Sequence, residues 1–261
     1  MCKRKLRDLV HEKDGPVWNE MQKILSIKEG AQNTGSFMIL ESRGRNRDEI
    51  KKLDSQQFRS RYWDARVFGN TFLESLKDDK STNWEEKEHF VRTGVAQFAI
   101  GMSVAPVRVE RMTNTNKAGV QEGKDRGMAP LGYRVVEHGV YCMPFFINPT
   151  AATKTGCTRR DIDLLLKLIP YAYPHTASHI RPLVEVRHAW YAEHKAPLGS
   201  FSEFRFIEAM TPTKKQNPDK PSTSWSEYKV PTSLPGDLQE KVHNFCDLCV
   251  SLPDWACSTT S

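Results

Sequence analysis

The sequence predicts an α+β protein, and three observations predict this class. Apolar residues recur at helical spacing in two separate segments, residues 3–10 and 158–169. Apolar and polar residues alternate in several short segments between and after them, as in half-buried strands. A polar excursion over residues 113–132 lacks apolar periodicity and returns to a strand-like run, which favours a long protruding hairpin.

The composition is that of a single globular domain with insertions. The 261 residues are 38% hydrophobic and 27% charged, which is enough apolar material for a sizeable core. No segment approaches the roughly 20 apolar residues of a membrane span, and no signal peptide follows the basic N-terminus, so we expect a cytoplasmic protein without a membrane partner. The six cysteines are then reduced thiols. The net charge of +6 permits attraction to a polyanion but does not establish it.

The first predicted helix places Leu6, Leu9 and Val10 on one face and basic residues on another. A solvated surface would explain the basic face equally well. Residues 14–95 are predicted to be a mainly helical or irregular region in which residues 61–69 are apolar enough to pack on the core.

Strands are predicted around residues 104–112, 139–147 and 183–191, with the hairpin over residues 113–134 after the first of them. A helix begins at Thr158, with Asp161 in the position of a capping box. Residues 211–236 are rich in Pro, Ser, Thr and Lys and are predicted to be a loop, and residues 237–252 a last helix. Without the insertions, this order is that of a ferredoxin-like, RNA-recognition-type fold that lacks its first strand.

Five ordered motifs carry a resemblance to a known family. Residues 63–69 (WDARVFG) resemble its W-D-V-R-x-F-G, and residues 94–98 (GVAQF) with 101–103 (GMS) resemble its G-P-V-Q-F and G-x-S. Residues 138–141 (HGVY) with 146–149 (FINP) resemble Y-G-L-Y and G-F-x-x-P. Residues 155–158 (TGCT) with Asp161 resemble T-G-x-T-x-x-D, and residues 178–181 (SHIR) stand where S-A-A-R is usual.

On these motifs the chain resembles the crRNA-coating backbone subunit of type I CRISPR Cascade, a RAMP protein, and it is most similar to the type I-C form. The resemblance implies an RNA-recognition-like palm, a helical fingers insertion and a β-hairpin thumb. It also implies a filament of several copies along the crRNA, which pairs with target DNA, and contacts with the large, processing and small subunits of Cascade. Family members begin with a strand before the basic helix, so we expect that this N-terminal strand is missing from the sequence given.

A backbone subunit must bind any spacer, so its contacts are expected at phosphate and sugar, with apolar wedges between bases. No catalytic residue, metal or cofactor is expected. Gln97 and Ser103 could donate to phosphate or satisfy neighbouring backbone groups, and Arg181 could reach RNA or a neighbouring subunit. The candidate RNA-binding residues are Lys3, Arg4, Lys5, Arg7, Arg66, Gly69, Gln97, Ser103, Arg108, Lys117, Lys124, Arg126, Met128, Arg134 and Arg181.

Three alternatives stay open. Type III backbone subunits, which share this fold, cut RNA with an Asp near the thumb, and Asp125 is the nearest acid here. A general protein-interaction module would differ by having no RNA affinity. His243, Cys246 and Cys249 have the residue types of a zinc site, but one turn apart on an amphipathic helix they are more typical of buried thiols.

Overall fold

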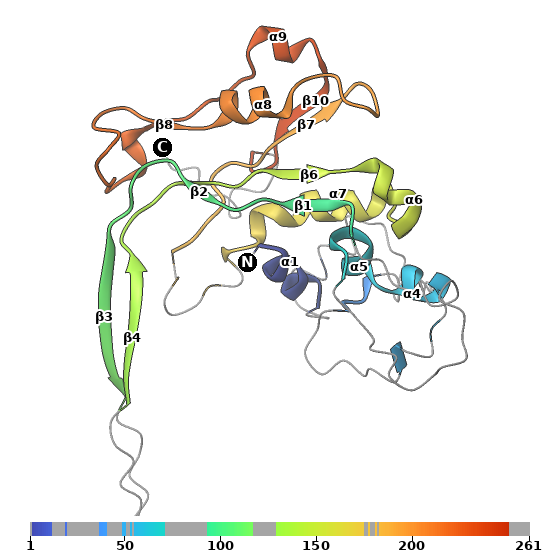
Figure 1. The fold of residues 1–261 in the computed structure, drawn as a ribbon, viewed down its shortest axis with the longest axis horizontal. Helices are drawn as coiled ribbons and strands as arrows, with labels where there is room; N and C mark the ends of the chain where they lie inside the picture. Colours follow the sequence, from blue (N-terminus) through green and yellow to red (C-terminus); the bar gives the residue numbers. More distant parts are fainter. Residues whose placement is uncertain are drawn as a thin grey trace, which may run out of the picture.

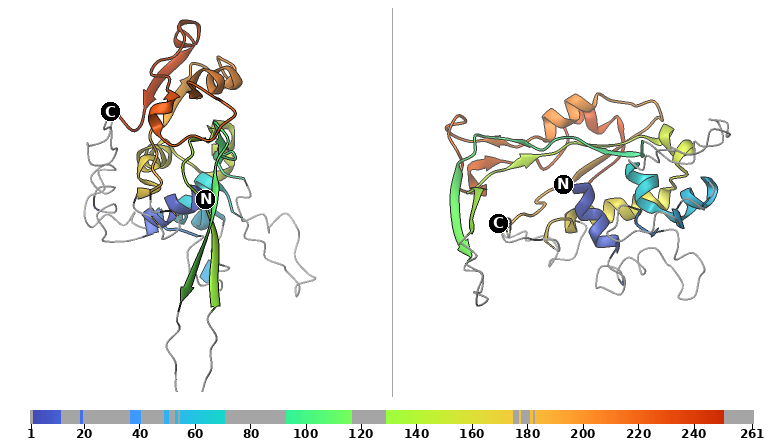
Figure 2. Two further views of the ribbon diagram at one scale, coloured as in Figure 1. Left: turned by 90° about the vertical axis from the view of Figure 1, so that its left-hand side faces the viewer. Right: turned by 60° about the horizontal axis from the view of Figure 1, so that its bottom comes forward.

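The computed structural model describes residues 2–11, 19, 37–40, 49–50, 53, 55–70, 93–116, 129–174, 177, 181 and 183–250. Helices lie on one side of a two-stranded ribbon, a smaller strand-and-helix layer lies on the other, and a long hairpin projects from one end (Figure 1). The side views show that the hairpin extends well away from the remaining elements (Figure 2).

Helix α1 (Cys2–His11) confirms the first predicted helix. Its apolar side chains Leu6, Leu9 and Val10 are almost completely buried, as the helical spacing indicates. They join one core cluster with α5 (Trp63–Phe68) and α7 (Arg159–Leu168). The N-terminal segment is therefore held by apolar burial, and its polar residues lie around the rim of that contact.

Helix α7 confirms the prediction of a helix beginning after Thr158. The Thr158 side chain accepts from the backbone of Asp161, and the Asp161 carboxylate accepts from the Thr158 amide at 2.8 Å, which completes a capping box. Pro170 lies in the short 3-10 turn η4 (Ile169–Tyr171), which follows α7 directly. A further 3-10 turn, η3 (Pro149–Ala151), and the short helix α6 (Ala152–Thr155) precede α7. Helix α4 (Ser55–Arg61) packs on α5.

The ribbon is formed by residues 96–104 and 140–147, which run antiparallel. Strand β1 (Ala96–Phe98) pairs with β6 (Phe145–Ile147), and β2 (Met102–Ser103) pairs with β5 (Tyr141–Cys142). The rings of Phe98 and Phe145 stack at 5.5 Å on the side that faces the core. The ribbon thus leads from the helical body to the hairpin, as Figure 1 shows.

The predicted hairpin is present, and its first strand begins later and reaches farther out than the strand expected around residues 104–112. Strand β3 (Val109–Asn116) pairs antiparallel with β4 (Ala129–Val136) over eight positions, from Val109 opposite Val136 to Asn116 opposite Ala129. Residues 117–128, which connect the two strands, lie outside the described residues. Lys117, Lys124, Asp125, Arg126 and Met128 therefore have no structural description.

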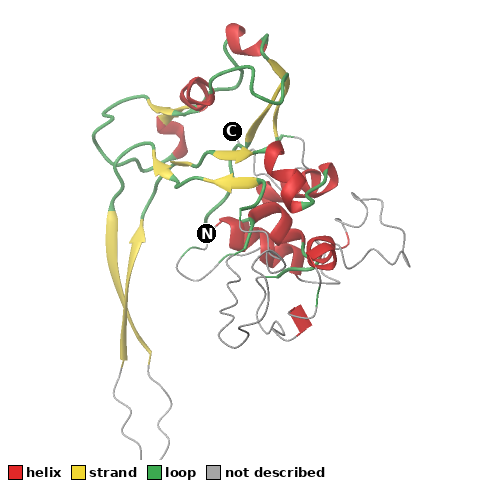
Figure 3. Ribbon diagram, turned by 45° about the vertical axis from the view of Figure 1, so that its right-hand side comes forward, coloured by secondary structure: helices red, strands yellow, loops and turns green. Residues whose placement is uncertain are grey.

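The layer above the ribbon corrects the prediction of a last helix over residues 237–252. Only α9 (Gly236–Gln239) is helical, and β10 (Val242–Asp247) is a strand that pairs with β7 (Trp190–His194). Leu238, Val242 and Phe245 fit a helical period, but Asn244, Cys246 and Asp247 are weak helix formers, and pairing with β7 outweighs the local preference. Figure 3 shows both strands beside the helices α8 (Glu203–Met210) and α9.

Residues 211–236 contain more regular structure than the predicted loop. Strands β8 (Thr213–Lys214) and β9 (Tyr228–Lys229) pair, with the 3-10 turn η6 (Trp225–Glu227) before β9. Ser222 accepts from Tyr228 Oη at 2.6 Å and lies 2.8 Å from Nδ1 of His138, just after β4. This segment therefore contacts the base of the hairpin.

The sheet differs from the continuous palm sheet that the predicted order suggests. Over the described residues, each strand pairs with one neighbour, so the two pairs of the ribbon, β1–β6 and β2–β5, and the β7–β10 pair are separate two-stranded sheets. The predicted strand over residues 183–191 begins at Trp190. The described structure is mixed helix and strand, in agreement with the α+β class.

Candidate nucleic-acid interface

Two arginines face each other across the hairpin. Arg111 of β3 lies directly opposite Arg134 of β4, and both side chains are exposed. Like charges at directly opposed positions of an antiparallel pair repel each other. Within the part of the chain that the structure describes, neither guanidinium has an ion-pair partner. The pair therefore presents two planar sets of donors that an external anion could bind.

Arg108, at the base of the hairpin, is partly neutralised. It lies 3.5 Å from Glu110 and 3.5 Å from Glu137. A hydrogen bond with the Glu110 carboxyl raises the pKa of Glu137, and the charge of Arg108 opposes that effect. The base of the hairpin thus balances its charge locally. Within residues 109–116 and 129–136, the positive charges without an ion-pair partner are those of Arg111 and Arg134.

Helix α1 offers a second basic surface, although not all of its basic residues are equivalent. Arg4 is exposed, and Lys3 and Lys5 are half-buried. Nζ of Lys3 donates to Oε1 of Gln97 at 3.3 Å and lies 5.9 Å from the centre of the Phe68 ring. Burial, with a smaller contribution from the charge of Arg7, lowers the pKa of Lys3.

Arg7 is held by a buried acid. Its Nε donates to Oδ2 of Asp64 at 2.9 Å, and Asp64 is completely buried, with its other oxygen accepting from the amide of Leu40 at 2.7 Å. The Arg7 guanidinium also lies 5.3 Å from the Phe68 ring. The structure therefore gives Arg7 a role in joining α1 to α5.

Arg66 is part of the core. Its guanidinium is 5% exposed, donates to both oxygens of Asp161 at 2.6 and 3.1 Å, and also donates to the carbonyls of Arg59 and Ser60. The bidentate pair satisfies a charge that would otherwise be costly to bury. The structure thus places the predicted site residue Arg66 in the packing of α5 on α7, away from the surface.

Gly69 ends α5 with a left-handed φ of 78°, where a glycine is strongly favoured. Its amide donates to the carbonyl of Ala65 at 3.0 Å. A Cβ on Gly94 would lie 2.2 Å from the Gly69 nitrogen, so the two backbones are in direct contact. This close approach between α5 and the segment leading into β1 explains Gly94, and the positive φ explains Gly69.

Gln97, Ser103 and Arg181 were predicted on weaker grounds. Nε2 of Gln97 donates to the carbonyl of Gly94 at 3.1 Å, and Oγ of Ser103 donates to the carbonyl of Ala105. Both side chains thus satisfy nearby backbone groups, the second of the two interpretations offered for them. Arg181 is exposed and lies close enough to Tyr173 for its charge to oppose the rise that burial causes in the pKa of that phenol.

Arg111 is not among the residues predicted to bind RNA. The strand predicted around residues 104–112 includes it, but its significance depends on the register that sets it opposite Arg134. Predicting the two hairpin strands does not by itself pair Arg111 with Arg134, because a connection of the length of residues 117–128 is compatible with several strand registers.

The residues of the possible zinc site are not on one helix. His243 and Cys246 belong to β10, and the buried Cys249 donates to the carbonyl of Val186 at 3.4 Å. Among the described residues, no three His, Cys, Asp or Glu side chains are placed to share a metal ion. Burial raises the pKa of Cys246, and it raises that of Cys2 to about 11 and that of Cys157 to about 12.

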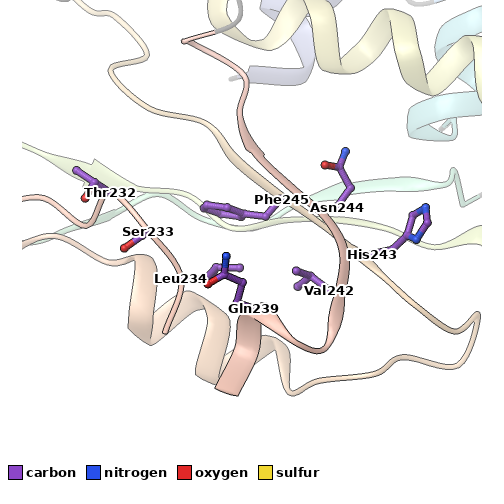
Figure 4. A pocket seen from close by; sticks show the side chains of 8 residues that line it. All are labelled: Thr232, Ser233, Leu234, Gln239, Val242, His243, Asn244 and Phe245. Atoms are coloured by element: carbon purple, nitrogen blue, oxygen red, sulfur yellow. The ribbon is translucent and has the colours of Figure 1, made fainter. Parts of the chain in front are cut away.

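A pocket lies beside β10 (Figure 4). It contains none of the candidate RNA-binding residues, and it is separate from the hairpin and from α1. The residues lining the pocket are Thr232, Ser233, Leu234, Gln239, Val242, His243, Asn244 and Phe245.

No helix in the described part of the chain has the length and apolar character needed to cross a membrane.

A compact body with a basic helix and a projecting hairpin that carries opposed arginines defines a class of protein suited to holding an extended polyanion. A model of the family CRISPR-associated protein Cas7 matches residues 1–233, and the chain belongs to that family. The family places the chain among the crRNA-binding backbone subunits of CRISPR interference complexes, which contain this subunit in several copies. No curated protein matches the chain.

Proposed function

We propose that the chain binds crRNA without sequence preference as the backbone subunit of a type I, I-C-like interference complex. Copies of the chain assemble along the guide RNA in the cytoplasm and present it for pairing with target DNA. The large, processing and small subunits of Cascade are its proposed further partners. In this proposal the ribbon and its helices act as an RNA-recognition-like palm and the β3–β4 hairpin acts as the thumb.

The observation that carries this proposal is the Arg111–Arg134 pair. Two guanidinium groups held opposite each other repel, and an anion between or beside them would relieve that repulsion. A phosphate can accept two parallel hydrogen bonds from a guanidinium. Phosphates repeat along RNA whatever the base, so contacts of this kind bind every spacer equally. The exposed Arg4 on α1 adds a second point of attraction on the body.

Replacing both hairpin arginines by glutamine is expected to weaken binding of unrelated single-stranded RNA sequences by about tenfold or more. Two lost phosphate contacts should also reduce the slope of log affinity against log salt by about 1.4. Because the substitutions remove a repulsion, the fold should be unaffected or slightly stabilised. Fluorescence anisotropy at several salt concentrations measures both quantities.

Arg159→Gln is the matched control. Arg159 is an exposed arginine, the first residue of α7, and it pairs with Asp163 at 2.9 Å and Glu193 at 3.1 Å. Helix α7 belongs to the helical body, away from the hairpin (Figure 1). Its replacement should leave RNA affinity unchanged. Equal affinities for the wild type and the double hairpin variant would contradict the proposal, and a loss confined to some RNA sequences would indicate base recognition instead.

We also propose that the subunit does not cleave RNA. The complex, incubated with guide-paired target RNA and Mg²⁺ or Mn²⁺, is expected to leave that RNA intact, because metal-assisted phosphoryl chemistry usually needs clustered acids. Gel analysis of labelled target RNA measures this. A metal-dependent cut that disappears in Asp125→Ala would contradict the proposal and support the ribonuclease function of type III backbone subunits.

A further inference from the structure

Tyr141 is a large aromatic residue that the phosphate contacts leave unexplained. It is the first residue of β5, it is 51% exposed, and it lies opposite Ser103 of β2. Among the residues that the structure describes, its ring stacks on no other ring and its hydroxyl has no hydrogen-bond partner. A buried or bonded tyrosine would serve packing, and this one keeps half of its surface in solvent.

The ring is supported from one side. A Cβ on Gly139 would come within 2.9 Å of Cε2 of Tyr141 and 3.1 Å of Cγ1 of Val107, so the Tyr141 ring and Val107 lie against the backbone of Gly139. A side chain at position 139 would displace the ring. Because Gly139 has no side chain, the Tyr141 ring packs against the ribbon, and the rest of its surface is exposed to solvent.

The position of Tyr141 connects the two parts of the candidate interface. It lies in the ribbon, where the backbone amide of Val104 donates to the carbonyl of Val140 at 2.9 Å, and β4 ends only five residues earlier at Val136. Exposed apolar side chains of Ile100 and Met102 lie on the facing strand segment. Beyond this point the hairpin carries Arg111 and Arg134.

From this arrangement we infer that Tyr141 is a stacking platform for one unpaired nucleobase of the bound RNA. The inference rests on the proposed function, since it needs RNA held by the neighbouring hairpin arginines. A phosphate bound at Arg111 and Arg134 brings its nucleotides to the base of the hairpin, where a base can stack on the open side of the ring. Every base has a π face, so this contact is independent of sequence.

Tyr141→Leu is the informative variant, because leucine keeps apolar contact with Gly139 and Val107 but removes the aromatic face. It is expected to weaken binding of single-stranded RNA by roughly 5- to 150-fold, the range for loss of one stacked base. RNA that carries 2-aminopurine at successive positions should be quenched by the wild type at one position for each bound subunit, and not by Tyr141→Leu. Tyr141→Phe should keep both affinity and quenching.

Phe204→Leu is the matched control, because Phe204 is an 83% exposed aromatic residue on α8, outside the proposed interface. It should change neither measurement. If Tyr141→Leu binds and quenches as the wild type does, while the Arg111 and Arg134 substitutions still weaken binding, the platform is refuted and the proposed function stands. If the wild type has no RNA affinity, the proposed function fails first. Reduced self-association with unchanged quenching would assign Tyr141 to a subunit contact and refute the platform.

Discussion

Replacing Arg66 by methionine is expected to lower the free energy of unfolding by about 3–5 kcal/mol. The substitution leaves the Asp161 carboxylate, which is 3% exposed, without the guanidinium that now binds both of its oxygens. It also removes the donor to the carbonyls of Arg59 and Ser60. Urea denaturation followed by circular dichroism measures the effect.

Two companion variants separate the buried charge from other causes. Arg159→Met removes an exposed arginine from the same region and should cost less than about 1 kcal/mol. Asp161→Asn combined with Arg66→Met removes the unpaired charge and should recover part of the loss. If Arg66→Met costs no more than Arg159→Met, the buried pair does not stabilise the contact between α5 and α7.

Gly94→Ala is expected to destabilise the fold strongly, although it adds only one methyl group. The added Cβ would lie 2.2 Å from the nitrogen of Gly69, 2.3 Å from the carbonyl carbon of Phe68 and 2.4 Å from the carbonyl oxygen of Val67. All three are backbone atoms, so no side-chain rotation can relieve the overlap. We expect a loss of more than about 4 kcal/mol, or failure to fold.

Gly132→Ala is the control for this effect, because a Cβ there meets no atom within 4 Å. It should change stability by no more than about 0.5 kcal/mol. The yield of folded protein and the urea midpoint of each variant are the measurements. A wild-type midpoint for Gly94→Ala would mean that the segment before β1 does not pass as close to α5 as the structure shows.

The two predictions together explain a motif that had been assigned to RNA contact. Residues 63–69 carry both Arg66 and Gly69, and the resemblance to a family of RNA-binding subunits suggested that these two positions approach RNA. In the structure, Arg66 neutralises a buried acid, and Gly69 ends α5 with a left-handed φ, with its backbone against that of Gly94. These two residues of the motif therefore serve the packing of the helical body and not direct contact with RNA.

Local features were predictable wherever nearby residues decide them. The spacing of Leu6, Leu9 and Val10 predicted α1, and Thr158 with Asp161 predicted the start of α7, because helical periodicity and capping act within a few residues. Helical periodicity gave the wrong element at β10. The apolar residues there fit a helical period, but the segment forms a strand because it pairs with β7. Pairing partners distant in sequence override a weak local preference.

The sequence was sufficient for the α+β class, the hairpin and the family, since periodicity, turn composition and ordered motifs are all properties of the chain itself. The roles of its arginines came from the fold. Arg7 and Arg66 are held by Asp64 and Asp161, whereas Arg111 lies exposed opposite Arg134. The four side chains have the same chemistry. Burial and strand register, which depend on residues far apart in the sequence, place two of them in the body, paired with acids, and leave two exposed on the hairpin, where we propose that they bind phosphate.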